Sequence, residues 1–187
     1  MRRRTIVFVS LLVLVGLTAS VAVAASVHLK GGRNAEPAFT DNGLSLTASG
    51  ALSGLGNADL TVTLLSNDAE VTSTCTNKGN NPAPGQNPAP LDVLGSQAIP
   101  AESVINGNVP FNVTTVAPAS TIEGAPGCPN SNWTETIDDL AFTNATIIVR
   151  QPDTNGTGPI VLTVTCTFSE PTEDGAVPSR DVSCTQS

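Results

Sequence analysis

The sequence has few of the side chains that enzymes use for catalysis. It contains one histidine, one tryptophan and no tyrosine among 187 residues. The single histidine, His28, stands near the N-terminus, so no Ser–His or Cys–His nucleophile can be assembled around it. A zinc site needs three or four His, Cys, Asp or Glu ligands, and the cysteines are better explained as disulfides. We therefore expect a protein that is not an enzyme and that holds no cofactor.

Basic residues are also scarce. Eight Lys and Arg stand against 16 Asp and Glu, which gives a formal net charge of −8. Three of the eight are Arg2, Arg3 and Arg4, so the chain from residue 25 onward carries five basic and 16 acidic residues, a net charge of −11. Such a surface repels a phosphate backbone and anionic lipid headgroups. Nucleic-acid binding is excluded as a function class.

Long apolar runs are missing except at the N-terminus. Arg2–Arg4 precede an apolar run from Ile6 to Leu17, and Ala22-Val23-Ala24 follows as a small-residue cleavage signal. This order predicts a secretory signal peptide over residues 1–24, hence a secreted protein with no membrane span after cleavage. An uncleaved segment that tethers the domain to the membrane is the alternative, because the run is about long enough to cross a bilayer.

Apolar and polar residues alternate along much of the remaining chain. Period-two alternation, rich in Thr on the polar side, is typical of strands with one buried face. It predicts strands at 44–49, 60–64, 71–76, 145–149 and 162–166, with two more near 91–99 and 109–116. Residues 25–38 are expected to be a flexible polar lead-in. The proline-rich segments 79–90 and 117–132 are expected to be loops.

Many short strands separated by turn signals, with no helical periodicity, favour an all-β fold. We predict one antiparallel β-sandwich domain over residues 39–187, with about seven to nine strands. An immunoglobulin-like or other Greek-key arrangement is the first choice, and a closed barrel is the second.

The register of one hairpin can be predicted. Asn155-Gly156 is a strong turn signal between two alternating segments. A hairpin centred there places Val149 opposite Leu162, Ile147 opposite Val164 and Ala145 opposite Cys166. A slip of one residue would set apolar side chains against threonines, so burial selects this register.

Four cysteines in an exported chain predict two disulfides. We favour Cys75–Cys128 with Cys166–Cys184, because a hairpin centred on Gly175 sets Cys166 opposite Cys184. The competing pairing, Cys75–Cys166 with Cys128–Cys184, would resemble an inter-sheet bridge.

Oxygen ligands in the expected loops and strand ends offer one route to metal binding. Calcium takes carboxylate, amide and carbonyl oxygens, and extracellular modules bind it weakly. The candidates are unspecific because no D-x-D-x-D-G loop is present; they are Asp41, Asp68, Glu70, Asp138 and Asp139.

Several phrases of the sequence are similar to a known group. They are FTDNGLSLTASGALSGLGNADL (39–60), NPAPGQNPAP (81–90), GSQAIPAE (95–102) and GAPGCPNSNWTE (124–135), together with the segments VTCTF and VSCT. These phrases resemble an uncharacterised family of small exported bacterial β-sandwich proteins, and the likeness spans most of the chain after the leader. The resemblance implies an exported, disulfide-containing β-domain and brings no activity, ligand or partner.

The expected function is a secreted or cell-surface interaction or matrix module that binds an extracellular or envelope protein or a glycan. The stiff segment 79–90 is the first candidate contact surface, because it loses little entropy on docking. One alternative is a calcium-dependent adhesion module. Another is a carbohydrate-binding or carbohydrate-active protein, for which Trp133 would be the only aromatic platform of its kind.

Overall fold

The computed structural model describes residues 27–86, 88–153 and 156–187, and within them every strand pairing is antiparallel. The smaller sheet contains β1 (His28–Leu29), β2 (Ala38–Asp41), β3 (Leu46–Ser53), β7 (Val109–Thr114) and β12 (Gly175–Ala176). The larger sheet contains β4 (Leu60–Thr76), β5 (Pro82–Pro84), β6 (Leu91–Ile99), β8 (Thr121–Ile122), β9 (Thr134–Ala141), β10 (Asn144–Arg150), β11 (Ile160–Phe168) and β13 (Val182–Gln186). Two short 3-10 turns, η1 (Ala101–Ser103) and η2 (Ser179–Asp181), complete the elements. The predicted signal peptide lies outside the described residues.

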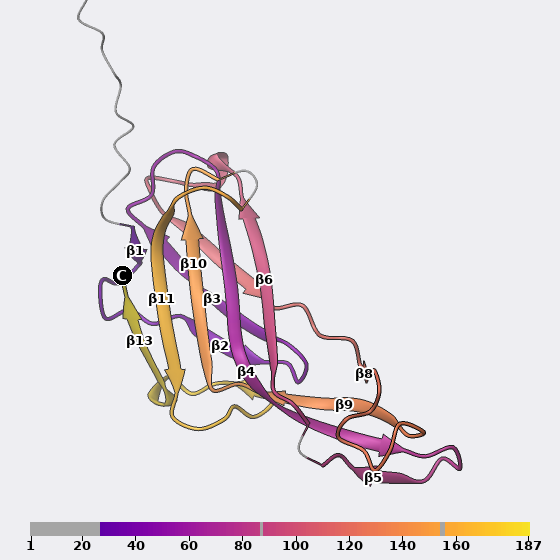
Figure 1. Cartoon of the computed structure of the whole chain (residues 1–187). Helices are drawn as coiled ribbons and strands as arrows, with labels where there is room; N and C mark the ends of the chain where they lie inside the picture. Colours follow the sequence, from indigo (N-terminus) through magenta and orange to yellow (C-terminus); the bar gives the residue numbers. More distant parts are fainter. Residues whose placement is uncertain (1–26, 87, 154–155) are drawn as a thin grey trace, which may run out of the picture.

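The two sheets pack face to face as a β-sandwich (Figure 1). Their inner faces share one apolar cluster, in which Phe39, Leu52 and Val113 of the smaller sheet meet side chains such as Leu64 and Ile147 of the larger one. The predicted antiparallel β-sandwich is therefore confirmed, and no closed barrel forms in the described part of the chain. Thirteen strands appear instead of seven to nine. Four of the thirteen, β1, β5, β8 and β12, have only two or three residues, too few for alternation to reveal them.

The 17-residue strand β4 organises the larger sheet. Its first half pairs with β6 on one edge and β10 on the other, and its second half pairs with β5 and β9. Leu64 lies opposite Ile147, and Val71 lies opposite Leu140, so β10 and the end of β9 follow β4 in one register along one edge. The register against β9 then shifts between Thr72 and Ser73. The register against β6 shifts between Ser66 and Ala69, where Asp68 has a φ of 53°. This bulge marks the point at which β4 leaves the sandwich.

Beyond the bulge the sheet continues as a projection that we call the arm. The arm comprises Glu70–Thr76 of β4 with β5, β8, β9 and the covering loop 117–133. Figure 1 shows it extending away from one end of the sandwich. Its base packs on the sandwich, since Leu140 and Ile137 of β9 belong to the shared apolar cluster, and its outer part depends on its own contacts for order.

The predicted hairpin register is confirmed. Val149 pairs with Leu162, Ile147 with Val164 and Ala145 with Cys166. Cys166 also pairs with Cys184 on the neighbouring strand, as the second predicted hairpin requires. Burial of one face fixed these pairings, as argued from the sequence.

Three segments differ from expectation. Residues 27–38 belong to the domain instead of leading into it: Leu29 is buried, β1 pairs with β3, and half-buried His28 lies opposite Ser53. Within 79–90, Pro82–Pro84 forms an edge strand, where a missing N–H can face solvent. Within 117–132, the short strand β8 pairs with β9.

Candidate functional sites in the arm and at its base

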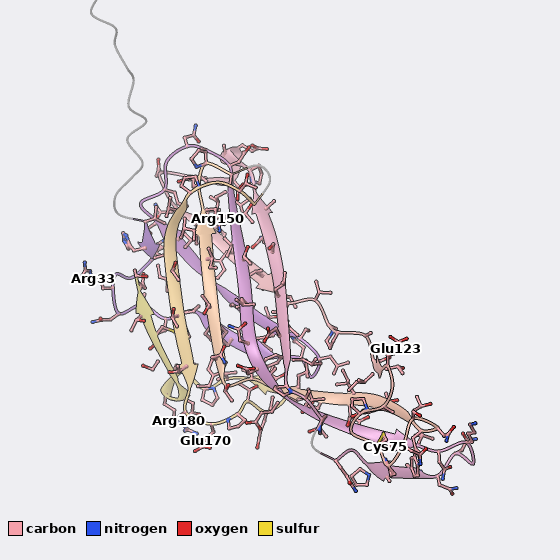
Figure 2. The ribbon with its side chains drawn as sticks, viewed as in Figure 1. Arg33, Cys75, Glu123, Arg150, Glu170 and Arg180 are labelled. Carbon is pink, nitrogen blue, oxygen red and sulfur yellow. A yellow bond between two sulfur atoms is a disulfide. The ribbon has the colours of Figure 1, made fainter. Side chains whose placement is uncertain are left out.

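The arm is braced from within by a disulfide and a buried carboxylate. Cys75 of β4 is bonded to Cys128 of the covering loop, with Cα atoms 5.7 Å apart, which confirms this predicted pair; the Cys166–Cys184 disulfide is confirmed as well. Figure 2 places Cys75 well out along the arm. Glu135 of β9 is fully buried beside this bridge. These groups hold the loop against one face of the arm sheet.

Glu135 ties the loop to the sheet through two hydrogen bonds. Ser73 Oγ donates to its Oε1 at 2.8 Å, and the Gly127 backbone N–H donates to its Oε2 at 2.9 Å. A Cβ at Gly127 would lie 2.3 Å from Oε1, so the loop can approach this closely only because residue 127 is glycine. Glu135 is thus a structural carboxylate with both oxygens satisfied.

The opposite face of the arm is open and regular. Thr74 lies opposite Pro84 on one side and Thr136 on the other, and Thr136 lies opposite Thr121. Because directly opposed residues share a face, these side chains form one surface of hydroxyls, methyls and proline rings, which we call the Thr–Pro face. Its full membership is Thr74, Thr76, Pro82, Pro84, Thr121, Thr134 and Thr136. Asp138 adds one carboxylate, which accepts a 2.6 Å hydrogen bond from Thr74 Oγ1.

Two of the five calcium candidates come together at the base of the arm. Asp41 and Asp139 meet Asp174, and one carboxylate oxygen from each lies within 4.8 Å of the other two. Sequence analysis did not include Asp174 among the calcium candidates, although it directly precedes the predicted turn at Gly175. The remaining candidates lie apart from this cluster: Asp68 in the bulge of β4, Glu70 on the arm and Asp138 on the Thr–Pro face.

The three carboxylates come from both layers of the fold. Asp41 ends β2, Asp174 precedes β12, and Asp139 belongs to β9 at the root of the arm. The Leu140 N–H donates to the Gly43 carbonyl at 3.1 Å, which joins the arm to the β2–β3 turn beside the cluster. The acidic cluster therefore sits where the arm meets the sandwich.

Asp41 is the buried member, with 3% of its surface exposed. The Gly43 N–H donates to its Oδ1 at 2.9 Å, and the Thr172 hydroxyl donates to its Oδ2. Burial raises the pKa of Asp41 above its ordinary value and is the largest cause; the two hydrogen bonds lower it, and the neighbouring charges of Asp139 and Asp174 raise it further. A divalent cation beside these groups would offset the charge that burial and repulsion disfavour.

A raised pKa has a defined effect on stability. Between the ordinary pKa of an aspartate and the raised value, the folded protein binds more protons at Asp41 than the unfolded chain does. The free energy of unfolding contributed by this group therefore falls as the pH rises through that window. At neutral pH without a cation, Asp41 is a destabilising charge.

Comparison with known proteins adds no relative. No protein-family model, no curated protein and no solved structure matches this chain. Among the described residues there is no helix long and apolar enough to span a membrane.

Proposed function

We propose that this protein is an exported, non-enzymatic β-sandwich module that binds a protein or glycan outside the cell through the Thr–Pro face of its arm. The observation that carries the proposal is the arm itself, a sheet outside the sandwich that is braced on one face and open on the other. Two disulfides support an oxidising compartment. An immunoglobulin-like or other Greek-key arrangement of the strands and secretion by the N-terminal leader are parts of the same proposal.

The construction of the arm favours binding. A surface that is ordered before binding loses little conformational entropy when a partner docks. The disulfide and the Glu135 hydrogen bonds supply this order at the inner face, and proline fixes the β5 edge. Proline also leaves β5 a poor template for another strand, so contact through the face is favoured over strand addition.

The test is saturable binding of the labelled, folded protein to the envelope of the producing cell. Replacing Thr121 and Thr134 by Lys places two charges on exposed positions of the Thr–Pro face. We expect this double variant to bind about tenfold more weakly, because buried unpaired charges oppose docking. The matched control is Thr165→Lys with Thr167→Lys, at exposed positions of β11 in the sandwich. Equal weakening by both variants, or no saturable binding by the parent protein, contradicts the proposal.

A second candidate function, calcium-dependent adhesion, is favoured by the cluster of Asp41, Asp139 and Asp174. Extracellular calcium modules bind the ion at about 10⁻⁴ to 10⁻³ M. Calcium at about 1 mM would then stabilise the folded protein by about 0.4 to 1.4 kcal/mol. An ion held here would also fix the arm to the sandwich, since the ligands belong to both.

Asp41→Asn separates calcium binding from a purely structural role. In EDTA at neutral pH two effects on stability oppose each other, because the variant removes a buried charge next to two others and replaces one of two acceptor oxygens by an N–H donor. The response to calcium, compared with each protein's own stability in EDTA, is therefore the readout. The stability of the variant should also vary less with pH across the window given above. Added calcium should raise the melting temperature of the parent protein and leave that of the variant unchanged.

The control for this measurement is Asp138→Asn, which changes an exposed neighbour outside the cluster. It should keep the full response to calcium. A parent protein whose melting temperature is the same in calcium and in EDTA has no calcium site.

A further inference from the structure

A groove lies at the end of the sandwich opposite the arm. It is formed by the segment after η1, the start of β7, β3 and the residue that follows β1. The groove is remote from the arm because η1 follows Ile99, which pairs with Leu60 at the first position of β4. It is an open groove of about 390 Å³, a volume within the range of small-molecule sites. Its lining residues are Lys30, Ala51, Ser103, Ile105, Asn106, Asn108, Val109 and Pro110.

The charge of the groove is opposite to that of the chain. Lys30 lines the groove and no Asp or Glu does, although acidic residues outnumber basic ones twofold in the sequence. The Lys30 N–H donates to the Ala51 carbonyl at 2.8 Å, which fixes the backbone from which its side chain extends. Within the described residues Lys30 forms no ion pair. The groove is therefore complementary to a single negative charge.

One wall of the groove is a rigid hairpin turn. Ile105 and Asn108 exchange two backbone hydrogen bonds of 2.9 and 3.0 Å around Asn106 and Gly107. Both central residues have positive φ, 52° and 72°, as a tight two-residue hairpin loop requires. The Ile105 side chain is 70% exposed on this wall, and the exposed Pro110 at the start of β7 also lines the groove.

The neutral polar groups argue for a ligand that carries hydroxyls. The Asn108 amide is already engaged, since its Nδ2 donates to the Asn106 carbonyl and its Oδ1 accepts from Ser53. Within the described residues, neither the Ser103 hydroxyl nor the Asn106 side-chain amide forms a hydrogen bond like those of the Asn108 side chain. An aliphatic acid would cover these two groups without replacing their hydrogen bonds to water, and this loss would cost binding free energy.

We propose that this groove binds the terminal uronic acid unit of a saccharide. Lys30 pairs with the carboxylate, Ser103 and Asn106 bind sugar hydroxyls, and Ile105 with Pro110 contacts a C–H face of the ring. The net negative charge of the chain repels a long polyanion, so a chain end is bound in preference to an internal segment. This site is independent of the arm, and its success or failure leaves the proposal for the arm unchanged.

Amide-resolved NMR titration of the full chain with glucuronate tests the proposal, with glucose and hexanoate as comparison ligands. We expect saturable shifts at Lys30, Ser103 and Asn106 with glucuronate. Affinities for glucose and hexanoate should be about tenfold weaker, because glucose lacks the carboxylate and hexanoate lacks the hydroxyls. Trp133 fluorescence should not change, since Trp133 belongs to the arm.

The decisive variants make the same charge change at two places. Lys30→Glu should weaken glucuronate binding about tenfold or more. Lys78→Glu, at an exposed position beyond β4, should leave it unchanged. Melting temperatures equal to that of the parent protein show that both variants fold. The proposal is overturned if glucuronate produces no saturable shift, if hexanoate or glucose binds as tightly, if both variants weaken binding equally, or if Trp133 fluorescence reports the binding.

Discussion

Removal of the Cys75–Cys128 disulfide should open the outer part of the arm while the sandwich stays folded. We expect Cys75→Ala with Cys128→Ala to lower the free energy of arm opening by about 3 kcal/mol, somewhat less than the chain-entropy value for the whole loop, because β6 and β7 within the loop stay folded. The population of the open arm then rises about a hundredfold. The outer part of the arm has no second layer from the smaller sheet to compensate, so the loss falls on its own contacts.

Limited proteolysis measures this opening. Chymotrypsin cleaves after aromatic residues, and Trp133 is half-buried where the covering loop enters β9. Where cleavage follows the open population, the rate at Trp133 should rise in proportion to it. The phenylalanines among the described residues are buried in the sandwich core, so they should remain protected; they are Phe39, Phe111, Phe142 and Phe168.

The matched control removes the other bridge. Cys166→Ala with Cys184→Ala deletes a cross-strand link between β11 and β13, which closes a shorter loop and contributes about 3 kcal/mol. It should lower the melting temperature of the sandwich and leave Trp133 protected at temperatures below the transition. Cleavage at Trp133 that is the same in both double variants would show that the arm does not depend on its own disulfide.

Much of the fold could be predicted because burial of one face determines register. Ala145, Ile147 and Val149 set apolar side chains on one face of β10, and a slip by one residue would expose them all. The same logic set Cys166 opposite Cys184. In these two hairpins the local sequence pattern and the tertiary packing favour the same register, so the register can be predicted from the sequence alone.

The arm could not be predicted from the same signals. Strand β4 continues through the polar stretch at Ser66–Asp68, where its alternation is interrupted. Its partners in the arm are β5, which has only three residues, and β9, whose own outer partner β8 has only two. Strand β9 contains Thr134, Glu135 and Asp138, which read as a polar segment until Glu135 is seen to be buried under the loop. Pairing of such segments is decided by long-range contacts and a disulfide, and local propensity carries little information about either.

The acidic cluster shows the same division. Asp41 and Asp139 were candidates by residue type alone, and 98 positions separate them in the chain. Only the crossing of β9 over the end of β2 brings them together with Asp174. Residue type identified the chemistry, and topology selected which carboxylates can share one ion.

Gly95 marks a second contact that sequence analysis missed, and its replacement should be among the most damaging single changes in the chain. A Cβ at this position would lie 1.9 Å from the Thr114 carbonyl oxygen and 2.8 Å from the Thr115 Cα. Both are backbone atoms, so no side chain can move aside to relieve the overlap. We expect Gly95→Ala to destabilise the folded protein by about 3 kcal/mol or more, measured by urea unfolding.

The reason lies in how the chain passes from the smaller sheet to the larger one. After β7, the Thr115 N–H donates to Leu46 in the smaller sheet, and the Val116 N–H donates to Leu94 in the larger sheet. Gly95 faces this crossing at close range, which brings the edges of β6 and β7 together. Without a Cβ the two backbones can satisfy these hydrogen bonds; with one, the crossing must separate and lose them.

Gly56→Ala provides the control, because it makes the same chemical change at an exposed site. The nearest atom to a Cβ there is the Gln151 Oε1 at 3.9 Å, an ordinary contact distance. This variant should be neutral or more stable by a few tenths of a kcal/mol, since alanine restricts the unfolded chain. If Gly95→Ala were as stable as Gly56→Ala, the β6–β7 crossing would have to be looser in solution than these distances allow. The joint between the two sheets would then not be the rigid element that holds the sandwich closed on this side.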